Sequence, residues 1–195
     1  MTCIVGIEHK GNVFIGGDSA GTNARMDLFT RADEKVFSNG SMIFGFCGSY
    51  RMGQLLQYSF NPPAQSVAED DFAYLCGPWM SSLIECLKSN GCATVKDNEI
   101  AVGGDFLLGF NGVIYQIHED FQVARRVEPY NACGCASDYA MGAMSLLIDE
   151  EGIPPEEKII MVLEIAEKFS AGVRGPFVIK QLSENEIDFM FTEEK

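Results

Sequence analysis

The residue of this sequence best suited to covalent chemistry is Thr2, which directly follows Met1. If Met1 is removed, as expected before so small a residue, Thr2 carries both a hydroxyl and a free α-amine. The hydroxyl is a nucleophile, and the amine, with a pKa near about 7.7 to 8.0, is a base at working pH. A threonine in second position is also common without any such role, so the following segments must support this interpretation.

Short apolar strands separated by turns follow Thr2. The first turn is expected at Lys10-Gly11-Asn12, and Asn39-Gly40 is a favoured two-residue hairpin turn. The expected strands are Thr2 to Ile7, Val13 to Gly17, Lys35 to Phe37 and Met42 to Phe46.

Four features together resemble a known family. They are the leading Thr2, the segment GGDSAGT over residues 16–22, the lysine at 35 and the segment GFCGS over residues 45–49. The combination resembles proteasome β-type subunits, the peptidase subunit of the bacterial ATP-dependent two-component protease, and related bacterial and phage proteins. All of these are N-terminal nucleophile hydrolases. The resemblance implies an α+β fold, a four-layer αββα sandwich of two packed, mainly antiparallel sheets flanked by helices, as one domain over residues 1–195.

The remaining elements fit that order, although periodicity alone indicates only a mixed α and β domain. Helices are expected near residues 52–60, 69–88, 137–149 and 155–169, with Pro78 kinking or dividing the second and Pro155 in the first turn of the last. Further strands are expected at 106–110 and 113–117, joined by an Asn111-Gly112 turn, and at 177–179 and 187–190.

The family's motif places Lys35 beside the nucleophile and Asp18 beside Lys35. A cation there keeps the Thr2 amine neutral and stabilises the developing alkoxide, and the carboxylate holds the cation in place. The spacing between Asp18 and Lys35 is about one residue longer than usual, but Lys35 is the lysine available in that segment. An ordinary ion pair at the strand ends is the structural alternative.

Backbone donors must also stabilise the oxyanion of the tetrahedral intermediate. By resemblance, Cys47-Gly48-Ser49 supplies one, with Gly48 at the matching position. Gly45 is the competing choice. Glycines that ease a turn from strand to helix would look the same.

Residues 134–142 resemble the family's glycine and serine turn before a helix. Ser137 matches the second serine of that turn, but Cys135 stands at the position of the first, where a thiol is a weaker hydrogen-bonding group. The proteasomal branch also carries an aspartate after its last long helix, where this chain has Ser170. The bacterial peptidase subunit lacks that aspartate too.

Substrate recognition in the family is largely through the main chain, with the peptide added as a strand. Thr22 matches a residue whose backbone makes such bonds. Phe46 and Tyr50 are expected near the pocket for the residue before the scissile bond, where they favour an apolar side chain unless they fill the pocket. Core packing is an equally good account of Phe46.

Composition sets further expectations. The net charge of -14 argues against nucleic acid as a partner, and no apolar run is long enough to cross a membrane. With no visible signal peptide, we expect a cytoplasmic protein whose seven cysteines are reduced. His9 and His118 provide no zinc or triad spacing, and neither a metal nor a cofactor is expected.

The sequence thus predicts a threonine endopeptidase that cleaves polypeptides within a homo-oligomeric ring. The ring and an ATP-dependent unfoldase as partner are implied by the resemblance alone. One alternative is a catalytically silent ring or scaffold protein, favoured by Cys135, Ser170 and any retention of Met1. Another is a small-molecule amidase that uses Cys3 as its nucleophile, which requires that Thr2 also be removed.

Overall fold

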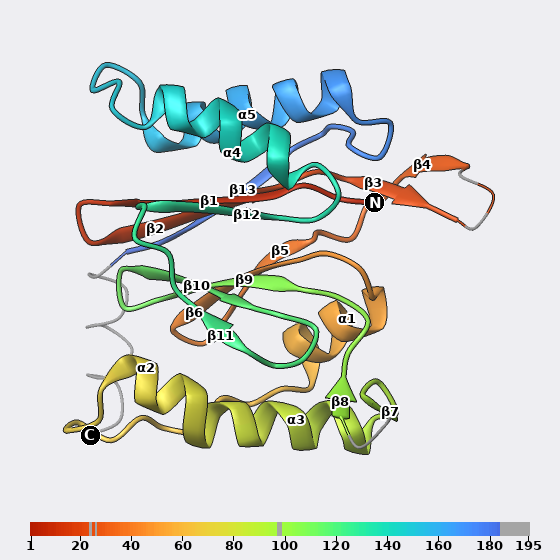
Figure 1. Ribbon diagram of the computed structural model, residues 1–195, viewed down its shortest axis with the longest axis vertical. Helices are drawn as coiled ribbons and strands as arrows, with labels where there is room; N and C mark the ends of the chain where they lie inside the picture. Colours follow the sequence, from red (N-terminus) through yellow and green to blue (C-terminus); the bar gives the residue numbers. More distant parts are fainter. Residues whose placement is uncertain (24, 26, 97–98, 184–195) are drawn as a thin grey trace.

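A computed structural model describes residues 1–23, 25, 27–96 and 99–183 of the chain. Figure 1 shows four stacked layers, two β-sheets inside and helices on both outer faces. The predicted αββα sandwich is therefore confirmed. The strand expected at residues 187–190 lies outside the described residues.

The first sheet has the strand order β12-β1-β2-β13 and is antiparallel throughout. Three of its strands were predicted from their apolar patterns, although β13 extends three residues beyond the end predicted at 179. The fourth, β12, was not predicted. The strands are β1 (Ile4–His9), β2 (Asn12–Gly17), β12 (Tyr130–Cys133) and β13 (Val178–Leu182).

The second sheet has the order β11-β10-β9-β6-β5. Its four longer strands were predicted, and the two-residue β11 was not. They are β5 (Val36–Asn39), β6 (Met42–Phe46), β9 (Phe106–Phe110), β10 (Val113–Ile117) and β11 (Val123–Ala124). Two small hairpins that were not predicted pair β3 (Ala20–Thr22) with β4 (Leu28–Thr30), and β7 (Thr94–Lys96) with β8 (Glu99–Ala101).

The turn expected at Asn111-Gly112 exists, whereas the turn expected at Asn39-Gly40 lies one residue later. Asn111 and Gly112 have φ values of 46° and 77°, the positive values that the favoured two-residue hairpin turn requires. In the earlier hairpin, Asn39 still pairs with Met42, so Gly40 and Ser41 form the turn. The Asn39 side chain donates instead to the carbonyls of Leu56 and Phe60, at 2.8 Å each, where the following helix ends.

Two helical layers cover the sheets. Helices α4 (Ser137–Leu147) and α5 (Pro155–Phe169) pack on the first sheet, and α5 begins with the proline expected in its first turn. Beside the second sheet lie α1 (Tyr50–Tyr58) and a segment that runs through α2 (Asp71–Tyr74), a π-helical turn η1 (Leu75–Trp79) and α3 (Met80–Ser89). Pro78 lies inside η1, so the predicted long helix is divided as expected.

Apolar side chains and a glycine bring the two sheets together. Ile4 and Ile15 of the first sheet and Val36 of the second belong to one fully buried cluster. A Cβ at Gly45 would lie 2.5 Å from the Ile4 Cγ2 atom and 2.7 Å from that of Ile15. The close approach of the sheets at this point therefore requires a residue without a side chain.

The strands also fix where the polar residues collect. β2 ends at Gly17, β6 ends at Phe46 and β12 ends at Cys133, while β1 begins at Ile4 and β5 begins at Val36. All these ends lie at the same end of the sandwich, near the N-terminus in Figure 1. The residues just beyond them are Thr2, Asp18, Lys35, Cys47 and Gly134.

Candidate active site

Thr2 lies in a buried position at the start of β1, with 4% of its surface exposed. Its hydroxyl accepts a hydrogen bond from Lys35 Nζ at 2.9 Å and donates one to the Met1 carbonyl at 2.5 Å. The nitrogen of Thr2 is an amide here because Met1 is attached, and it donates to the Cys135 sulfur at 3.4 Å. The hydroxyl and the nitrogen of Thr2 thus both face polar partners from distant parts of the chain.

Lys35 bridges Thr2 and Asp18. Its Nζ atom also donates to Asp18 Oδ1 at 2.9 Å, and the side chains of this ion pair are 1% and 0% exposed. Burial lowers the pKa of Lys35 below that of an ordinary lysine, and the adjacent Asp18 carboxylate opposes this shift. The sequence placed these three residues together, and the structure has them in direct contact.

The Asp18 carboxylate is held by main-chain donors as well. Oδ1 accepts from the Cys3 amide at 2.9 Å, and Oδ2 accepts from the amides of Ala20 at 2.8 Å and Arg174 at 3.4 Å. With Lys35, four donors surround one buried carboxylate. Asp18 therefore fixes both the cation and the backbone beside Thr2.

Gly48 occupies an exposed position just after β6, with a φ of +88° that favours glycine. Among the described residues, its N–H donates to no protein acceptor. The competing residue Gly45 lies within the ladder between Val36 of β5 and Leu107 of β9. Of the two candidates, Gly48 is the one that lies outside the ladder, is exposed and has an amide without a protein acceptor among the described residues.

The turn before α4 touches Thr2 directly. A Cβ at Gly134, whose φ is +100°, would lie 2.3 Å from the Thr2 carbonyl oxygen and 3.4 Å from Cys47 Cβ. Gly134 is thus packed between Thr2 and the segment that carries Gly48. Sequence reasoning did not single out Gly134 for this contact, although it begins the glycine and serine turn.

Of the other residues expected at the Thr2 amine, Cys135 makes the contact and the serines lie around it. Ser137 is the first residue of α4, and its backbone N–H donates to Gly134 O at 3.1 Å. Within the described residues its hydroxyl has no hydrogen bond. The Ser170 hydroxyl lies 3.9 Å from the Cys135 sulfur. The thiol therefore stands between Thr2 and Ser170.

Met1 fills the space in front of Thr2. Its terminal nitrogen donates to the Thr22 hydroxyl at 3.3 Å, and its side chain packs where a Cβ of Gly172 would lie only 2.1 Å from Met1 Cβ. Thr22, expected to bind the substrate main chain, is the last residue of β3. Met1 therefore spans from β3 to the segment that follows α5.

Phe46 and Tyr50 form an edge-to-face pair with ring centres 6.1 Å apart. Phe46 is 4% exposed and packs against Phe37 as well, whereas Tyr50 is half-buried under the Arg31 guanidinium, 3.7 Å from its ring centre. A pocket of about 370 Å³ adjoins Phe46 and is lined mainly by polar and charged side chains, including Arg31, Asp33, Glu34 and Gln54.

Cys3 does not present a usable thiol in this structure. It is 0% exposed, it belongs to the apolar cluster under α4 and α5, and burial raises the pKa of its thiol to about 12. Among the described residues, no three His, Cys, Asp or Glu side chains are grouped to hold a metal ion. No helix in the described part of the chain is long and apolar enough to span a membrane.

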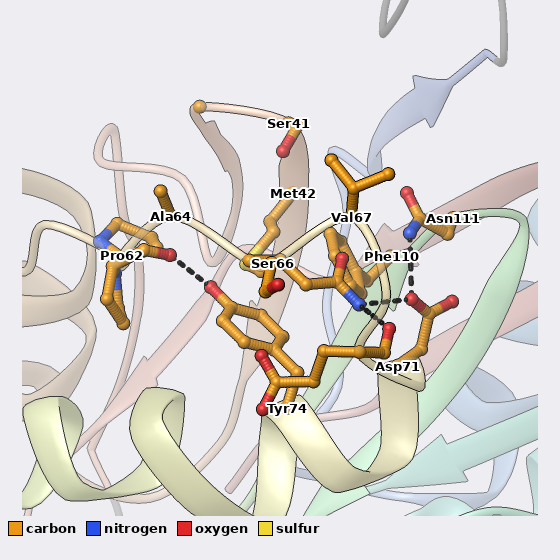
Figure 2. A pocket seen from close by; sticks show the side chains of 14 residues that line it. Ser41, Met42, Pro62, Ala64, Ser66, Val67, Asp71, Tyr74, Phe110 and Asn111 are labelled. Carbon is orange, nitrogen blue, oxygen red and sulfur yellow. Dashed lines mark hydrogen bonds between the residues drawn. The ribbon is translucent and has the colours of Figure 1, made fainter.

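A larger cavity, of about 500 Å³, lies elsewhere, between the loop before α2 and two hairpin turns. Figure 2 shows that its polar groups bond to one another: the Tyr74 hydroxyl donates to the Pro63 carbonyl, and the Gln65 and Asn111 amides donate to Asp71. None of the Thr2 cluster lines it, so it contributes nothing to that site.

Comparison of the sequence with protein-family models gives no match, and neither does comparison with curated proteins. Solved structures do match. BPH from Thiobacillus denitrificans is 19% identical in its complex with epoxomicin, with a TM-score of 0.77 over 93% of this chain and 98% of that one. HslV from Trypanosoma brucei is 17% identical, with a TM-score of 0.68 over 94% and 100% of the two chains. Anbu from Yersinia bercovieri is 12% identical, with a TM-score of 0.62 over 97% and 91%.

These likenesses extend over nearly all of each chain. At such low identity they establish the arrangement of the backbone, not the chemistry of the site. Together with the sandwich described above, they show that the chain has the fold of the proteasome-like N-terminal nucleophile hydrolases.

Proposed function

We propose that the protein is a threonine peptidase whose nucleophile is the Thr2 hydroxyl, released for catalysis by cleavage of the bond between Met1 and Thr2. One observation carries the proposal. The buried Lys35 ammonium lies 2.9 Å from both the Thr2 hydroxyl and the Asp18 carboxylate. An ion pair with a structural role alone has no need of a nucleophile within hydrogen-bonding distance of its cation.

The chemistry follows from these contacts. The Thr2 oxygen attacks the substrate carbonyl carbon, and the freed α-amine takes the hydroxyl proton. Lys35 stabilises the negative charge on the Thr2 oxygen, and the Gly48 amide donates to the oxyanion. Breakage of the carbon–nitrogen bond returns the proton to the departing amine. Water then hydrolyses the ester on Thr2 by the same steps.

Met1 blocks this chemistry in two ways. Its peptide bond turns the Thr2 nitrogen into an amide, which cannot act as a base. Its side chain and terminal nitrogen also occupy the space between Gly172 and Thr22, where β3 would pair with an extended peptide. The form of the protein that carries Met1 should therefore be inactive.

The proposed substrate is a polypeptide held mainly through its backbone. We further propose that the subunits assemble into a closed ring that encloses the Thr2 sites, with an ATP-dependent unfoldase as a partner. The fold shared with HslV supports this part of the proposal. A ring confines cleavage to chains that can enter it, which suits an enzyme with little selectivity for side chains.

A catalytically silent scaffold is the second candidate, and the contacts of Met1 favour it. The terminal nitrogen and the side chain of Met1 both have partners in the folded protein, and a thiol takes the place of a serine beside Thr2. In that case the Lys35 and Asp18 pair stabilises the strand ends only.

One experiment separates the two candidates. Protein with Thr2 exposed by release of a cleavable leader is compared with protein that retains Met1, using a fluorogenic peptide and epoxomicin, the compound bound in the first BPH structure. The enzyme predicts turnover, and an increase in intact mass equal to one epoxomicin, for exposed Thr2 only. Thr2→Ser should retain some activity and Thr2→Ala none. Folded protein with Thr2 exposed that shows neither result supports the scaffold.

A further inference from the structure

The segment Gly103 to Asp105, between β8 and β9, lies directly against the segment that carries Gly48. The Cys47 N–H donates to the Asp105 carbonyl at 2.9 Å, and the Ser49 N–H donates to the Gly103 carbonyl at 2.8 Å. Both neighbours of Gly48 are therefore tied to one short stretch of chain. The two segments are more than 50 residues apart in the sequence.

The two backbones meet at a distance that excludes side chains. A Cβ at Gly48 would lie 2.4 Å from the Gly103 carbonyl oxygen, and a Cβ at Gly104 would lie 2.1 Å from the Cys47 carbonyl oxygen. Both obstacles are backbone atoms, which cannot move aside as the tip of a side chain can. The contact thus depends on glycine at both positions.

This contact leaves one amide unused at the end of β6. The amides of Cys47 and Ser49 are bonded to the segment Gly103 to Asp105, here called the clamp, while Gly48 N–H donates to no acceptor within the described residues. Phe46 N–H donates to the Lys35 carbonyl at 3.1 Å, and Gly134 links Cys47 to Thr2. The segment that carries the free amide is thereby tied to the backbone of Lys35 and, through Gly134, to Thr2.

We propose that Gly104 is a positioning residue for the oxyanion donor: by allowing Gly103 to Asp105 to close on Cys47 and Ser49, it fixes the direction of the Gly48 N–H. The inference rests on the proposed function, because it concerns how that same site stabilises its transition state. Catalysis is sensitive to such placement. A donor lost from the oxyanion lowers the rate by about 10²–10³-fold, and a shift of about 1 Å in a reacting group can cost about 10²-fold.

Asp105 fastens the clamp from its other side. Its carboxylate accepts from the Glu119 amide at 3.1 Å and from the Gln116 side chain at 3.3 Å, and it lies 3.3 Å from His118 Nδ1. These partners belong to β10 and the loop that follows it. Asp105 therefore offers a way to loosen the clamp without inserting a methyl group into it.

The test compares Gly104→Ala with Gly103→Ala in protein with Thr2 exposed. Gly103 is a matched control, because a Cβ there would meet only Ser49 Cβ at an ordinary 3.7 Å. For Gly104→Ala we expect kcat to fall by about 10- to 100-fold with KM changed by less than about threefold, as for loss of an interaction made only in the transition state. The inhibition constant of a peptide aldehyde, whose hemiacetal oxygen needs the same donor, should rise in parallel. Gly103→Ala should change none of these values.

Asp105→Ala provides a second route if Gly104→Ala does not fold. It should lower kcat several-fold with KM unchanged, and Asp105→Asn, which keeps an acceptor for the Glu119 amide, should restore most of the loss. The proposal is overturned if a folded Gly104→Ala retains the wild-type kcat, or if its kcat falls while aldehyde binding is unaffected. It is also overturned if Asp105→Asn is as impaired as Asp105→Ala. An inert parent protein with Thr2 exposed instead identifies a failure of the proposed function, on which this inference depends.

Discussion

At the scale of single residues, the Lys35 ammonium is the group on which the proposed chemistry depends. It is buried, and both polar atoms around it, Thr2 Oγ1 and Asp18 Oδ1, are acceptors. Lys35→Ala should lower kcat/KM by at least about 10²-fold, since the Thr2 alkoxide loses its nearest positive charge. Steady-state kinetics on folded protein, checked by circular dichroism, tests this. Near-normal turnover would mean that the cation acts elsewhere.

The buried position of Lys35 also predicts a pH dependence. Because burial lowers its pKa, Lys35 loses its proton at a lower pH than an exposed lysine does. Activity that needs the cation is therefore present below that pKa and is lost as the pH rises through it. The acid limb comes from protonation of the Thr2 amine. A profile of kcat/KM against pH should be bell-shaped, and a plateau extending into the ordinary lysine range would contradict this account.

Asp18, the counter-ion of Lys35, should matter for the stability of the fold. Four donors converge on its carboxylate. In Asp18→Asn an NH₂ group takes the place of one oxygen and faces donors, and Lys35 is left charged and buried without its counter-ion. Removal of one partner from a buried ion pair typically costs about 3–5 kcal/mol. Urea unfolding should show a loss of this size, whereas a stability within about 1 kcal/mol of the parent would indicate that water replaces the pair.

Cys135 is exposed, and its sulfur accepts from the Thr2 nitrogen at 3.4 Å. An oxygen is a better acceptor than a thiol, so Cys135→Ser should raise kcat a few-fold and remove inhibition by a thiol-alkylating reagent. Cys135→Ala should lower kcat, because the amine loses its partner. Equal rates for all three proteins would show that this residue does not position Thr2.

At the scale of elements, a glycine packed between the sheets and a glycine with open space around it should respond in opposite ways to substitution by alanine. Gly45→Ala would place a methyl group against Ile4 and Ile15 between the sheets, which should destabilise the protein by about 1–3 kcal/mol. Gly142→Ala is the matched control. It lies inside α4 with open space around it, so better helix propensity should stabilise the protein by about 0.5–1 kcal/mol. Opposite shifts in thermal midpoint confirm this, and a neutral Gly45→Ala would contradict it.

The elements also show what could be predicted from the sequence. Strong apolar runs such as Phe106–Phe110, and the long period of α5, allowed the strands and helices of the layers to be placed. β12 was missed because it is a short strand, Tyr130–Cys133, whose partner β1 lies at the other end of the chain. β4 was missed because its three residues are all exposed, so no buried period marks it.

The candidate site also has a part that could be predicted from the sequence and a part that could not. Thr2, Asp18 and Lys35 could be predicted because each belongs to a local motif. The clamp at Gly103 to Asp105 could not, because its partner is more than 50 residues earlier and the contact is made by backbone atoms. The place of Met1 against Gly172 is likewise a matter of packing. Backbone contacts of this kind leave no pattern in one sequence beyond isolated glycines.

At the scale of the whole molecule, the outer helices carry exposed apolar side chains. These include Leu146 of α4 and Phe169 of α5, and the hairpin of β3 and β4 adds Leu28 and Phe29. In the proposed ring, such side chains would be covered by neighbouring subunits. Native mass spectrometry should therefore show species far above the 21.4 kDa of one chain. A monomer at micromolar concentration would contradict the chambered form of the proposed function.

The four donors around Asp18 carry a further consequence, for the order in which the chain folds. The Asp18 carboxylate accepts from the amide of Cys3 and from that of Arg174, which is 156 residues further along the chain than Asp18. Thr2 likewise contacts Cys135, 133 residues away. Contacts between such distant positions form late, since much of the chain must already be ordered before they stabilise anything. A partly folded chain therefore has no aligned nucleophile. Under the proposed function, proteolytic capacity would arrive only with the completed sandwich, and a nascent subunit would be unable to cut itself or its neighbours.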